Sequence, residues 1–279
     1  MSNSPLSARL TPVALTVAGS DSGGGAGIQA DLKTFAALGV YGASVLSALT
    51  AQNTQGVQGV MPVPADFVSA QLESVLSDMP VAAIKTGMLA DADSINAVAA
   101  ALRQLALPLV VDPVMVATSG DRLLPASAVS AMRDTLLPLA HVLTPNIPEA
   151  AVLLREREAT CVDDMVQQAQ ALLALGAHAV LLKGGHLTTD DAVDVYCDAR
   201  GCQLLREPRV TTRNTHGTGC TLAAAICARL ALGDGAERAA RYGKSYLYQA
   251  LCHADELSVG AGAGPVNHFY FHSPPRGLA

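Results

Sequence analysis

The chain has 279 residues and 50% of them are hydrophobic, so it can bury one large core or two small ones. Its 18 basic and 24 acidic residues give a net charge of −6, which excludes the basic surface of a nucleic-acid-binding or anionic-membrane-binding protein. The six cysteines lack the close paired spacings of a zinc site. We expect free thiols in a reducing compartment, a cytoplasmic protein without a membrane span, and no nucleic-acid or membrane partner.

No linker, internal repeat or change of composition divides the chain, so we expect a single domain over residues 1–279. The first dozen residues are polar and contain two prolines, and the apolar run after them is too short for the core of a secretory signal. We expect residues 1–12 and 272–279 to be mobile tails.

The first motif along the chain is a short apolar run, residues 13–18, followed by a glycine-rich loop, 19–27, and a helical pattern, 28–38. A strand, a loop and a helix in this order are also found in dinucleotide-binding units. The acidic residue that such a unit needs about 20 residues later would fall near Ser47, where the chain has none, so a nicotinamide site is excluded. The loop stays a candidate ligand loop.

After this loop, short apolar runs alternate with segments whose apolar residues recur at helical spacing. Such alternation predicts an α/β fold in three layers, with a mostly parallel central sheet and helices on both faces. A pair of runs at 192–198 and 202–206 has the spacing of an antiparallel edge hairpin, and a last helix is expected over 236–254. The predicted strands are residues 43–50, 81–86, 109–111, 141–143 and 179–182, and the predicted helices are 68–79, 93–105, 126–137 and 162–173.

The segment 214–221 combines two glycines with a following run of small and apolar residues, 222–230. Glycine lets the backbone turn sharply against a ligand, and the run predicts a helix that begins at the turn. Free N–H groups and the positive end of the helix dipole make residues 217–219 a candidate anion site. Cys220 lies in the first turn, where the same field lowers the pKa of a thiol. The alternative is an ordinary loop with Cys220 as a small core residue.

In a parallel sheet, ligands bind beyond the carboxyl ends of the strands, and here polar and glycine residues follow the predicted strands. Carboxylates and an amide can hold Mg²⁺, a lysine can contact phosphates, and a helix start can take developing charge, which are the parts that phosphoryl transfer requires. No P-loop sequence is present, so another phosphate site must serve. Asn146 and Glu149 also fit a capping box, and both roles can coexist. These strand-end residues are Asp21, Gln52, Gly87, Met88, Asp112, Asn146, residues 183–185 and residues 217–220.

Taken together, the motifs resemble the hydroxymethylpyrimidine/phosphomethylpyrimidine kinases, the thiamine-biosynthesis members of the ribokinase-like superfamily. The resemblance covers about residues 13–270 in the family's order. It implies transfer of the γ-phosphoryl group of ATP, with Mg²⁺, to 4-amino-5-hydroxymethyl-2-methylpyrimidine and then to its monophosphate. It also implies a homodimer. The segments that carry it are residues 18–21, 24–31, 51–54, 85–89, 112–115, 144–150, 183–186 and 214–221.

The same resemblance implies a pyrimidine site at one set of loops. The side-chain amide of Gln52, which offers both a donor and an acceptor, would hydrogen-bond the aminopyrimidine. Gly19, Ala26, Met88 and Val114 would surround the ring.

A phosphate site is implied at the other loops. Asn146 and Glu149 resemble the magnesium-associated Asn-x-x-Glu of the superfamily, Asp112 would lie beside the phosphates and the metal, and Lys183 resembles the lysine that contacts the transferring phosphate. Cys220 stands where many relatives carry aspartate, the proposed base. The remaining members are Gly217, Thr218 and Gly219 of the anion hole and Lys244, a nucleotide-side lysine for which a solvated helix face is the alternative.

Two rival functions remain at this stage. A vitamin B6 (pyridoxal or pyridoxine) kinase would share the scaffold and the anion hole, and the residues around the ring distinguish it from a pyrimidine kinase. A catalytically silent nucleotide-binding regulatory protein is disfavoured by the intact lysine, carboxylates and anion hole. A simple ATP turnover assay decides the second question.

Overall fold

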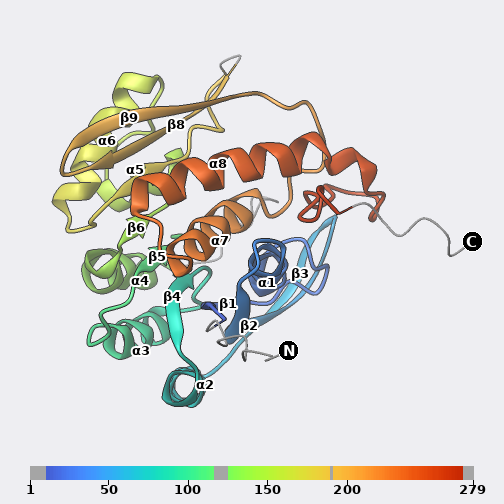
Figure 1. The fold of residues 1–279 in the computed structure, drawn as a ribbon. Coiled ribbons are helices and arrows are strands. Elements are labelled where there is room, and N and C mark those ends of the chain that lie inside the picture. The colour runs from blue at the N-terminus through green and yellow to red at the C-terminus, as the bar shows by residue number, and fades with distance from the viewer. Residues whose placement is uncertain (1–10, 116–124, 189–190, 273–279) are drawn as a thin grey trace, which may run out of the picture.

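A computed structural model describes residues 11–115, 125–188 and 191–272, and within them the strands form one nine-stranded sheet (Figure 1). The strand order is β3-β2-β1-β4-β5-β6-β7-β8-β9. The predicted parallel centre is confirmed, because the run from β2 to β7 in this order is parallel throughout. Its strands are β1 (Val13–Gly19), β2 (Tyr41–Asn53), β4 (Val81–Thr86), β5 (Leu109–Val111), β6 (Val142–Leu143) and β7 (Val180–Leu182).

Both edges of the sheet are antiparallel, whereas we expected only one such edge. The expected hairpin is present as β8 (Asp191–Asp198) and β9 (Gly201–Pro208), with β8 antiparallel to β7. At the other edge β3 (Gly56–Pro62) pairs antiparallel with the end of β2, which is longer than predicted. All seven residues of β3 are at least partly exposed. A strand with no buried face has none of the hydrophobic alternation that reveals a strand in sequence.

Helices cover both faces of the sheet, as the predicted three layers require (Figure 1). One face packs against α1 (Gly27–Ala37), α7 (Thr218–Ala231) and α8 (Ala236–Cys252), with Phe35 and Ile226 in this core. The other face packs against α2 (Ala65–Asp78), α3 (Ala92–Leu102), α4 (Ala126–Ala131), α5 (Ile147–Leu154) and α6 (Val162–Ala174). The chain continues from α4 through a π-helical turn, Met132–Leu136, and a 3₁₀ turn, Leu137–Leu139.

The expectation of six free thiols is wrong for two of them. Cys197 in β8 and Cys202 in β9 stand directly opposite each other in the hairpin register, with their Cα atoms 4.1 Å apart, and form a disulfide. The turn between them brings together two cysteines that are only five residues apart, which spacing alone did not suggest. The other four cysteines, at positions 161, 220, 227 and 252, are free.

The expected tails lie mostly outside the described residues, at 1–10 and 273–279. The inner end of the first expected tail is tied to the sheet, since the backbone N–H of Tyr41 donates to the carbonyl oxygen of Pro12 at 2.9 Å. In the part of the chain that the structure describes, no helix has the length and apolar character needed to cross a membrane. The single domain over residues 1–279 stays a prediction.

The winding of the chain reverses at β1. From β1 the chain passes to β2 on one side, and then reaches β4 on the other side and proceeds outward to β7. The loops that follow β1 and β4 therefore diverge and leave a crevice at the carboxyl edge of the sheet, where open α/β folds bind ligands. The glycine-rich loop 19–27 follows β1, and Gly87 and Met88 follow β4.

Candidate active site

A cavity of about 740 Å³ opens at this crevice. Its lining draws on the loops after β1, β4, β5, β6 and β7, on the first turn of α7 and on α8. Every residue to which the family resemblance assigned a role lines this cavity, although the assignments span more than two hundred positions. These residues are Gly19, Ala26, Gln52, Met88, Asp112, Val114, Asn146, Glu149, Lys183, Gly217, Thr218, Gly219, Cys220 and Lys244. The strand-end candidates Gly87 and Gly184, in contrast, are not among the lining residues.

The predicted turn before α7 is present. Gly217 caps the helix in the left-handed conformation, with φ +79°, which disfavours any residue with a side chain. It also lies against the first glycine loop, because a Cβ atom at Gly217 would be 1.8 Å from the carbonyl oxygen of Gly25. A Cβ atom at Gly219 would lie 3.3 Å from Lys183 Nζ and 3.8 Å from Asp112 Oδ2. The amino end of α7, with its positive dipole, thus faces both the glycine loop and the charged cluster.

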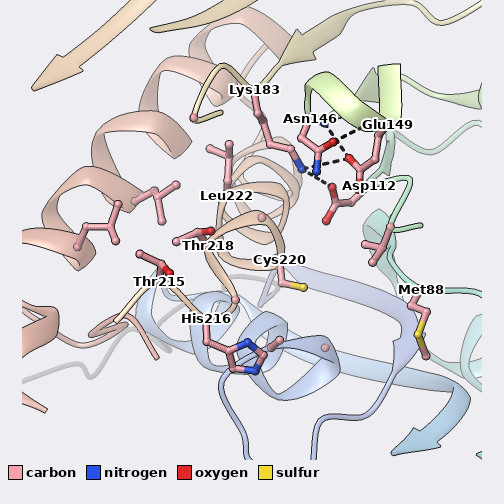
Figure 2. A pocket seen from close by; sticks show the side chains of 18 of the residues that line it. Met88, Asp112, Asn146, Glu149, Lys183, Thr215, His216, Thr218, Cys220 and Leu222 are labelled. Carbon is pink, nitrogen blue, oxygen red and sulfur yellow. Dashed lines mark hydrogen bonds and ion pairs between the residues drawn. The ribbon is translucent and has the colours of Figure 1, made fainter. Parts of the chain in front are cut away.

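That charged cluster joins three strand-end loops (Figure 2). Lys183 Nζ lies 2.9 Å from Asp112 Oδ1 and 3.8 Å from Glu149 Oε2, and Thr144 Oγ1 donates to Asp112 Oδ1 at 3.1 Å. Figure 2 shows the side chains of Lys183, Asn146, Asp112 and Glu149 pointing toward one another. Burial disfavours the charged form of Lys183, but Asp112 and Glu149 outweigh it and hold the pKa of Lys183 above its ordinary value.

Asn146 and Glu149 form the capping box of α5. The Asn146 side chain accepts from the Glu149 backbone N–H at 2.8 Å, and Glu149 Oε2 accepts from the Asn146 N–H at 2.7 Å. Burial and the neighbouring Asp112 charge raise the pKa of Glu149 to about 7, against the lowering effect of Lys183. The capping box predicted from the sequence is thus formed. It uses Oε2 of Glu149 and leaves Oε1 outside the box.

Cys220 sits in the first turn of α7 as expected, but the expectation for its pKa is wrong. Burial raises the pKa of the thiol to about 11, although Lys85 and the backbone N–H of Gly27 lower it. The positive field of a helix N-terminus lowers the pKa of a thiol, but here the loss of hydration on burial raises the pKa by more. The thiol is therefore protonated near neutral pH in the protein without substrates.

The predicted pyrimidine contacts lie around the first glycine loop. Gln52 Oε1 accepts from Thr50 Oγ1 at 3.2 Å, and Gln52 Nε2 lies 3.4 Å from His216 Nε2. His216 Nε2 in turn lies 2.8 Å from Asp21 Oδ2. Gln52 is only partly buried, so its amide can exchange these partners for a ligand.

Lys244 does not belong to a solvated helix face. Its ammonium lies 2.8 Å from Asp194 Oδ2, with the lysine side chain 9% exposed, and Asp194 Oδ1 accepts from the Gly184 N–H at 2.9 Å. The ion pair thus ties α8 to the loop that carries Lys183. That alternative for Lys244 is wrong, whereas a contact with a nucleotide stays a prediction.

The structure contains two further side-chain pairs that the sequence analysis did not predict, and the first joins Asp21 to His216. Asp21 accepts hydrogen bonds from the backbone N–H groups of Gly23, Gly25 and Ala26 as well as facing His216, so it shapes the whole glycine loop. Burial opposes the charged form, but His216 and these N–H groups lower the pKa of Asp21 below its ordinary value.

The second missed pair joins Lys85 to Asp31. Lys85 Nζ is 2.8 Å from both carboxylate oxygens of Asp31, and neither side chain is exposed. The sequence carries a signal for it, since a lysine in the middle of a strand that is buried on both faces needs an opposite charge nearby.

A mostly parallel sheet with this charged, glycine-lined cavity at its switch point defines a ribokinase-like small-molecule kinase. Among solved structures the chain is similar to an ADP complex of Bacillus subtilis pyridoxal kinase, with a TM-score of 0.87 and 38% identity over 94% of this chain and 98% of that chain. Sequence relatives are more specific. A hydroxymethylpyrimidine/phosphomethylpyrimidine kinase of Rhizobium meliloti is 54% identical over 263 residues, 94% of this chain and 98% of the relative.

The sequence pattern of the phosphomethylpyrimidine kinase family matches residues 21–267. The chain also matches a thiamine biosynthesis bifunctional protein of Geobacter sulfurreducens, with 52% identity over 91% of this chain and 51% of that longer protein. The chain belongs to the hydroxymethylpyrimidine/phosphomethylpyrimidine kinase family. The predicted family, the kinase activity and the ribokinase-like fold are thereby confirmed, and a catalytically silent protein is disfavoured.

Proposed function

We propose that the protein transfers the γ-phosphoryl group of ATP to the hydroxymethyl group of 4-amino-5-hydroxymethyl-2-methylpyrimidine, and then to the resulting monophosphate, in thiamine biosynthesis. The observation that carries this proposal is the cavity itself, in which two ends share one continuous lining. The end with the neutral amide of Gln52 is called the neutral end, and the end with Lys183, Asp112, Glu149 and the anion hole is called the charged end. One site then serves both steps, and the monophosphate binds with its phosphate where the hydroxyl had been.

At the neutral end, Gln52 would pair with the polar edge of the aminopyrimidine. Met88 and Val114 would contact the ring faces, and Gly19 and Ala26 would leave room for it along the glycine loop. An amide fits this edge because it offers one donor and one acceptor, and a ligand would replace its contacts with Thr50 and His216.

At the charged end, Lys183 would contact the transferring phosphate, and the backbone N–H groups at 217–219 would take its developing charge. Phosphoryl transfer passes through a loose transition state, so catalysis consists mainly of position and charge neutralisation. The short distances between Lys183, Asp112 and the start of α7 support these roles for Lys183 and for the backbone of residues 217–219. Thr218 and Asn146 would hydrogen-bond ATP from either side of Lys183.

Lys244 and the apolar residues beside it would form the nucleotide end of the cavity. Val210, Leu247 and Leu251 line this part, where a purine would be shielded from water. The kinase family and the ADP complex of the Bacillus relative support ATP use.

Mg²⁺ is a proposal that the donor set supports. The described residues contain no cluster of three or more metal-binding side chains, so an all-protein cage is not available. Mg²⁺, however, commonly binds through one or two carboxylates, waters and substrate phosphates, and Asp112 and Glu149 provide two carboxylates beside the phosphate site. When bound there, Mg²⁺ would neutralise charge on the phosphates. The chain's own part is to hold both carboxylates in place through Thr144 and the Asn146 capping box.

Cys220 is proposed to take the proton of the attacking hydroxyl. Its raised pKa means that this role needs the charges around the sulfur to favour a thiolate once substrates are bound. If they do not, the backbone of residues 217–219 acts alone and Cys220 only packs in the anion hole.

A homodimer and a cytoplasmic location are also proposed. The open edge strand β3 and its neighbour β2 expose Leu49, Val60 and Met61 by 39%, 46% and 59%, which suits contact with a second copy. The cytoplasmic location rests on the supply of ATP there, since the Cys197–Cys202 disulfide removes part of the argument from free thiols.

The test is phosphorylation of the pyrimidine alcohol, its monophosphate and pyridoxal, side by side, with ATP and Mg²⁺. We expect turnover of the two pyrimidines with a higher kcat/KM than pyridoxal. A preference for pyridoxal would instead favour a vitamin B6 kinase, the alternative that the Bacillus subtilis structural neighbour suggests.

A further inference from the structure

His216 comes directly before the anion-hole glycine Gly217, but it has no role in the proposed phosphoryl transfer. In Figure 2 its ring lies below Cys220, on the side away from Lys183. The side chain lines the cavity and is only 12% exposed. A polar ring with so little access to water needs partners within the protein. Those partners lie at the neutral end of the cavity.

The surrounding backbone fixes the place of the His216 ring. The His216 N–H donates to the carbonyl oxygen of Gly264 at 3.0 Å. A Cβ atom at Gly25 would lie 2.5 Å from His216 Cδ2 and 3.3 Å from Pro265 Cβ, so the imidazole packs directly on the glycine loop where a side chain would collide with it. The ring has little room to move, and its nitrogen Nε2 is therefore held at one point of the cavity wall.

The hydrogen on this nitrogen is assigned by its closest partner. His216 Nε2 lies 2.8 Å from Asp21 Oδ2 and 3.4 Å from Gln52 Nε2. Oδ1 of Asp21 accepts from the N–H of Gly23, and Oδ2 accepts from two further backbone N–H groups. Two oxygens that both accept in this way belong to an ionised carboxylate, which has no hydrogen to donate. His216 Nε2 must therefore carry a hydrogen and donate it to Asp21.

This assignment decides which atom of the Gln52 amide suits His216. With its hydrogen directed at Asp21, His216 Nε2 has no lone pair for the NH₂ group of Gln52 and can share that hydrogen only with an acceptor. On the other side, Thr50 Oγ1 donates to the carbonyl oxygen of Ser20 at 2.8 Å, and its 3.2 Å contact with Gln52 must share the same single hydrogen. Half a turn of the amide about its last bond satisfies both neighbours. The Gln52 oxygen then accepts from His216, and the Gln52 NH₂ group donates to Thr50.

We propose that His216 is a positioning residue that orients the Gln52 amide for the ligand. Its N–H, fixed on Asp21, holds the amide oxygen on its own side, and the NH₂ group then faces Thr50. One lone pair and one hydrogen of the amide are left for the cavity, in a fixed order. An aminopyrimidine edge, with an amino donor beside a ring-nitrogen acceptor, matches that order, whereas the ring of pyridoxal has no such pair. The inference rests on the proposed function and adds the group that sets the order.

The hydrogen on Nε2 can be tested without any substrate. Nitrogen-15 NMR of the histidine side chains distinguishes a ring nitrogen that carries a hydrogen from one that does not, and loss of the signals in His216→Phe assigns them. We expect His216 to be protonated at Nε2 at pH 7.5. A His216 ring protonated at Nδ1 alone would overturn the inference. Because no acceptor is present, this result is independent of which ring the enzyme phosphorylates.

The effect on the ligand is tested by calorimetry with the pyrimidine alcohol in the absence of ATP. His216→Phe keeps a flat ring on the glycine loop but has no donor, so we expect binding about tenfold weaker, as for one lost hydrogen bond. His216→Gln returns an N–H near the place of Nε2 and should restore binding to within about threefold of the wild type. Unchanged binding by His216→Phe would overturn the inference.

A double-variant comparison separates positioning from support of the fold. If His216 acts through Gln52, His216→Phe should weaken binding by less than about twofold when it is made in the Gln52→Met variant. The same tenfold loss in both backgrounds would show that His216 acts on the fold or on the ligand directly, and would overturn the inference. A wild-type protein that does not bind the alcohol would instead contradict the proposed function, and the NMR result would then decide the inference by itself.

Discussion

The two ends of the cavity differ in the group that each offers to a ligand. One end brings Lys183 to within 2.9 Å of Asp112 and 3.8 Å of Glu149, whereas the other presents the neutral amide of Gln52, 3.4 Å from His216. In the proposed function, charge at the first end would act on the phosphoryl group whatever the acceptor is. A single amide at the second end can distinguish one ring from another. Substitutions at the charged end should therefore change rates for every acceptor, and those at the neutral end should change the choice between acceptors.

The largest effect is expected from Lys183→Ala. Loss of the ammonium should lower kcat for both the alcohol and the monophosphate by about 10³-fold, as for other groups that neutralise transition-state charge. Steady-state assays with each acceptor measure this, and Lys183→Arg, which keeps the charge, is the matched control. Loss of one step with the other at the wild-type rate would show that the two phosphorylations do not share a site.

Cys220→Ala also changes the charged end, and it tests whether the thiol takes the proton of the acceptor hydroxyl. General base catalysis contributes about 10²- to 10⁴-fold, and we expect the lower limit for the alcohol because the thiol pKa is raised and the transition state is loose. The effect on the monophosphate should be smaller, since that acceptor is already ionised. Single-turnover kinetics separate chemistry from binding. A wild-type single-turnover rate with the alcohol would show that Cys220 is not the base and that the backbone of residues 217–219 acts without it.

Gln52→Met addresses the neutral end. The polar edge of the pyrimidine would lose its partner, at a cost of about 1 to 3 kcal/mol, or about 5- to 150-fold in kcat/KM. Pyridoxal should be affected less. Competition assays with both acceptors measure the ratio, and equal losses for the two would assign Gln52 to the scaffold.

The smallest effect concerns the support of α7. Buried His268 lies 3.1 Å from Thr221 Oγ1, and burial, with Lys33, lowers its pKa to about 4. The unfolded chain takes up a proton below about pH 6.5 while the folded chain does not, so stability is present above that pH and is lost as pH falls toward 4. We expect the His268 contribution to fall by about 1 kcal/mol between pH 7 and pH 5.5. Urea unfolding of wild type and His268→Gln measures it, and identical pH slopes would contradict the prediction.

The elements of the sheet were predictable where burial imposes a pattern. Residues 81–86 and 109–111 are strands at the predicted bounds, because both faces of these strands lie under helices and the sequence there is continuously apolar except at Lys85 and Thr86. The edge strand β3 escaped prediction because it is exposed and contains two glycines. A hydrophobic pattern in the sequence reveals a strand only where the strand is buried, and the edge strand β3 has no buried residue.

The residues at strand ends that line the cavity were predictable, because chemistry restricts residue type at those positions. What the sequence did not contain was the balance between opposing effects. For Cys220, the helix dipole was visible in the chain, but the burial that outweighs it depends on how loop 25–27 closes over α7. The partners of Lys85 and Lys244 lie 54 and 50 positions away on other elements, and only the fold brings them together.

The contact between Gly217 and Gly25 has a consequence for synthesis of the protein. The glycine loop leaves the ribosome before the helix that completes it, which follows about 190 residues later. At about 5 to 20 residues per second, the loop waits on the order of 10 to 40 s for its partner. During that time the glycine loop lacks the contact with Gly217, and the cavity cannot close. The cavity can therefore close only after α7 has been made.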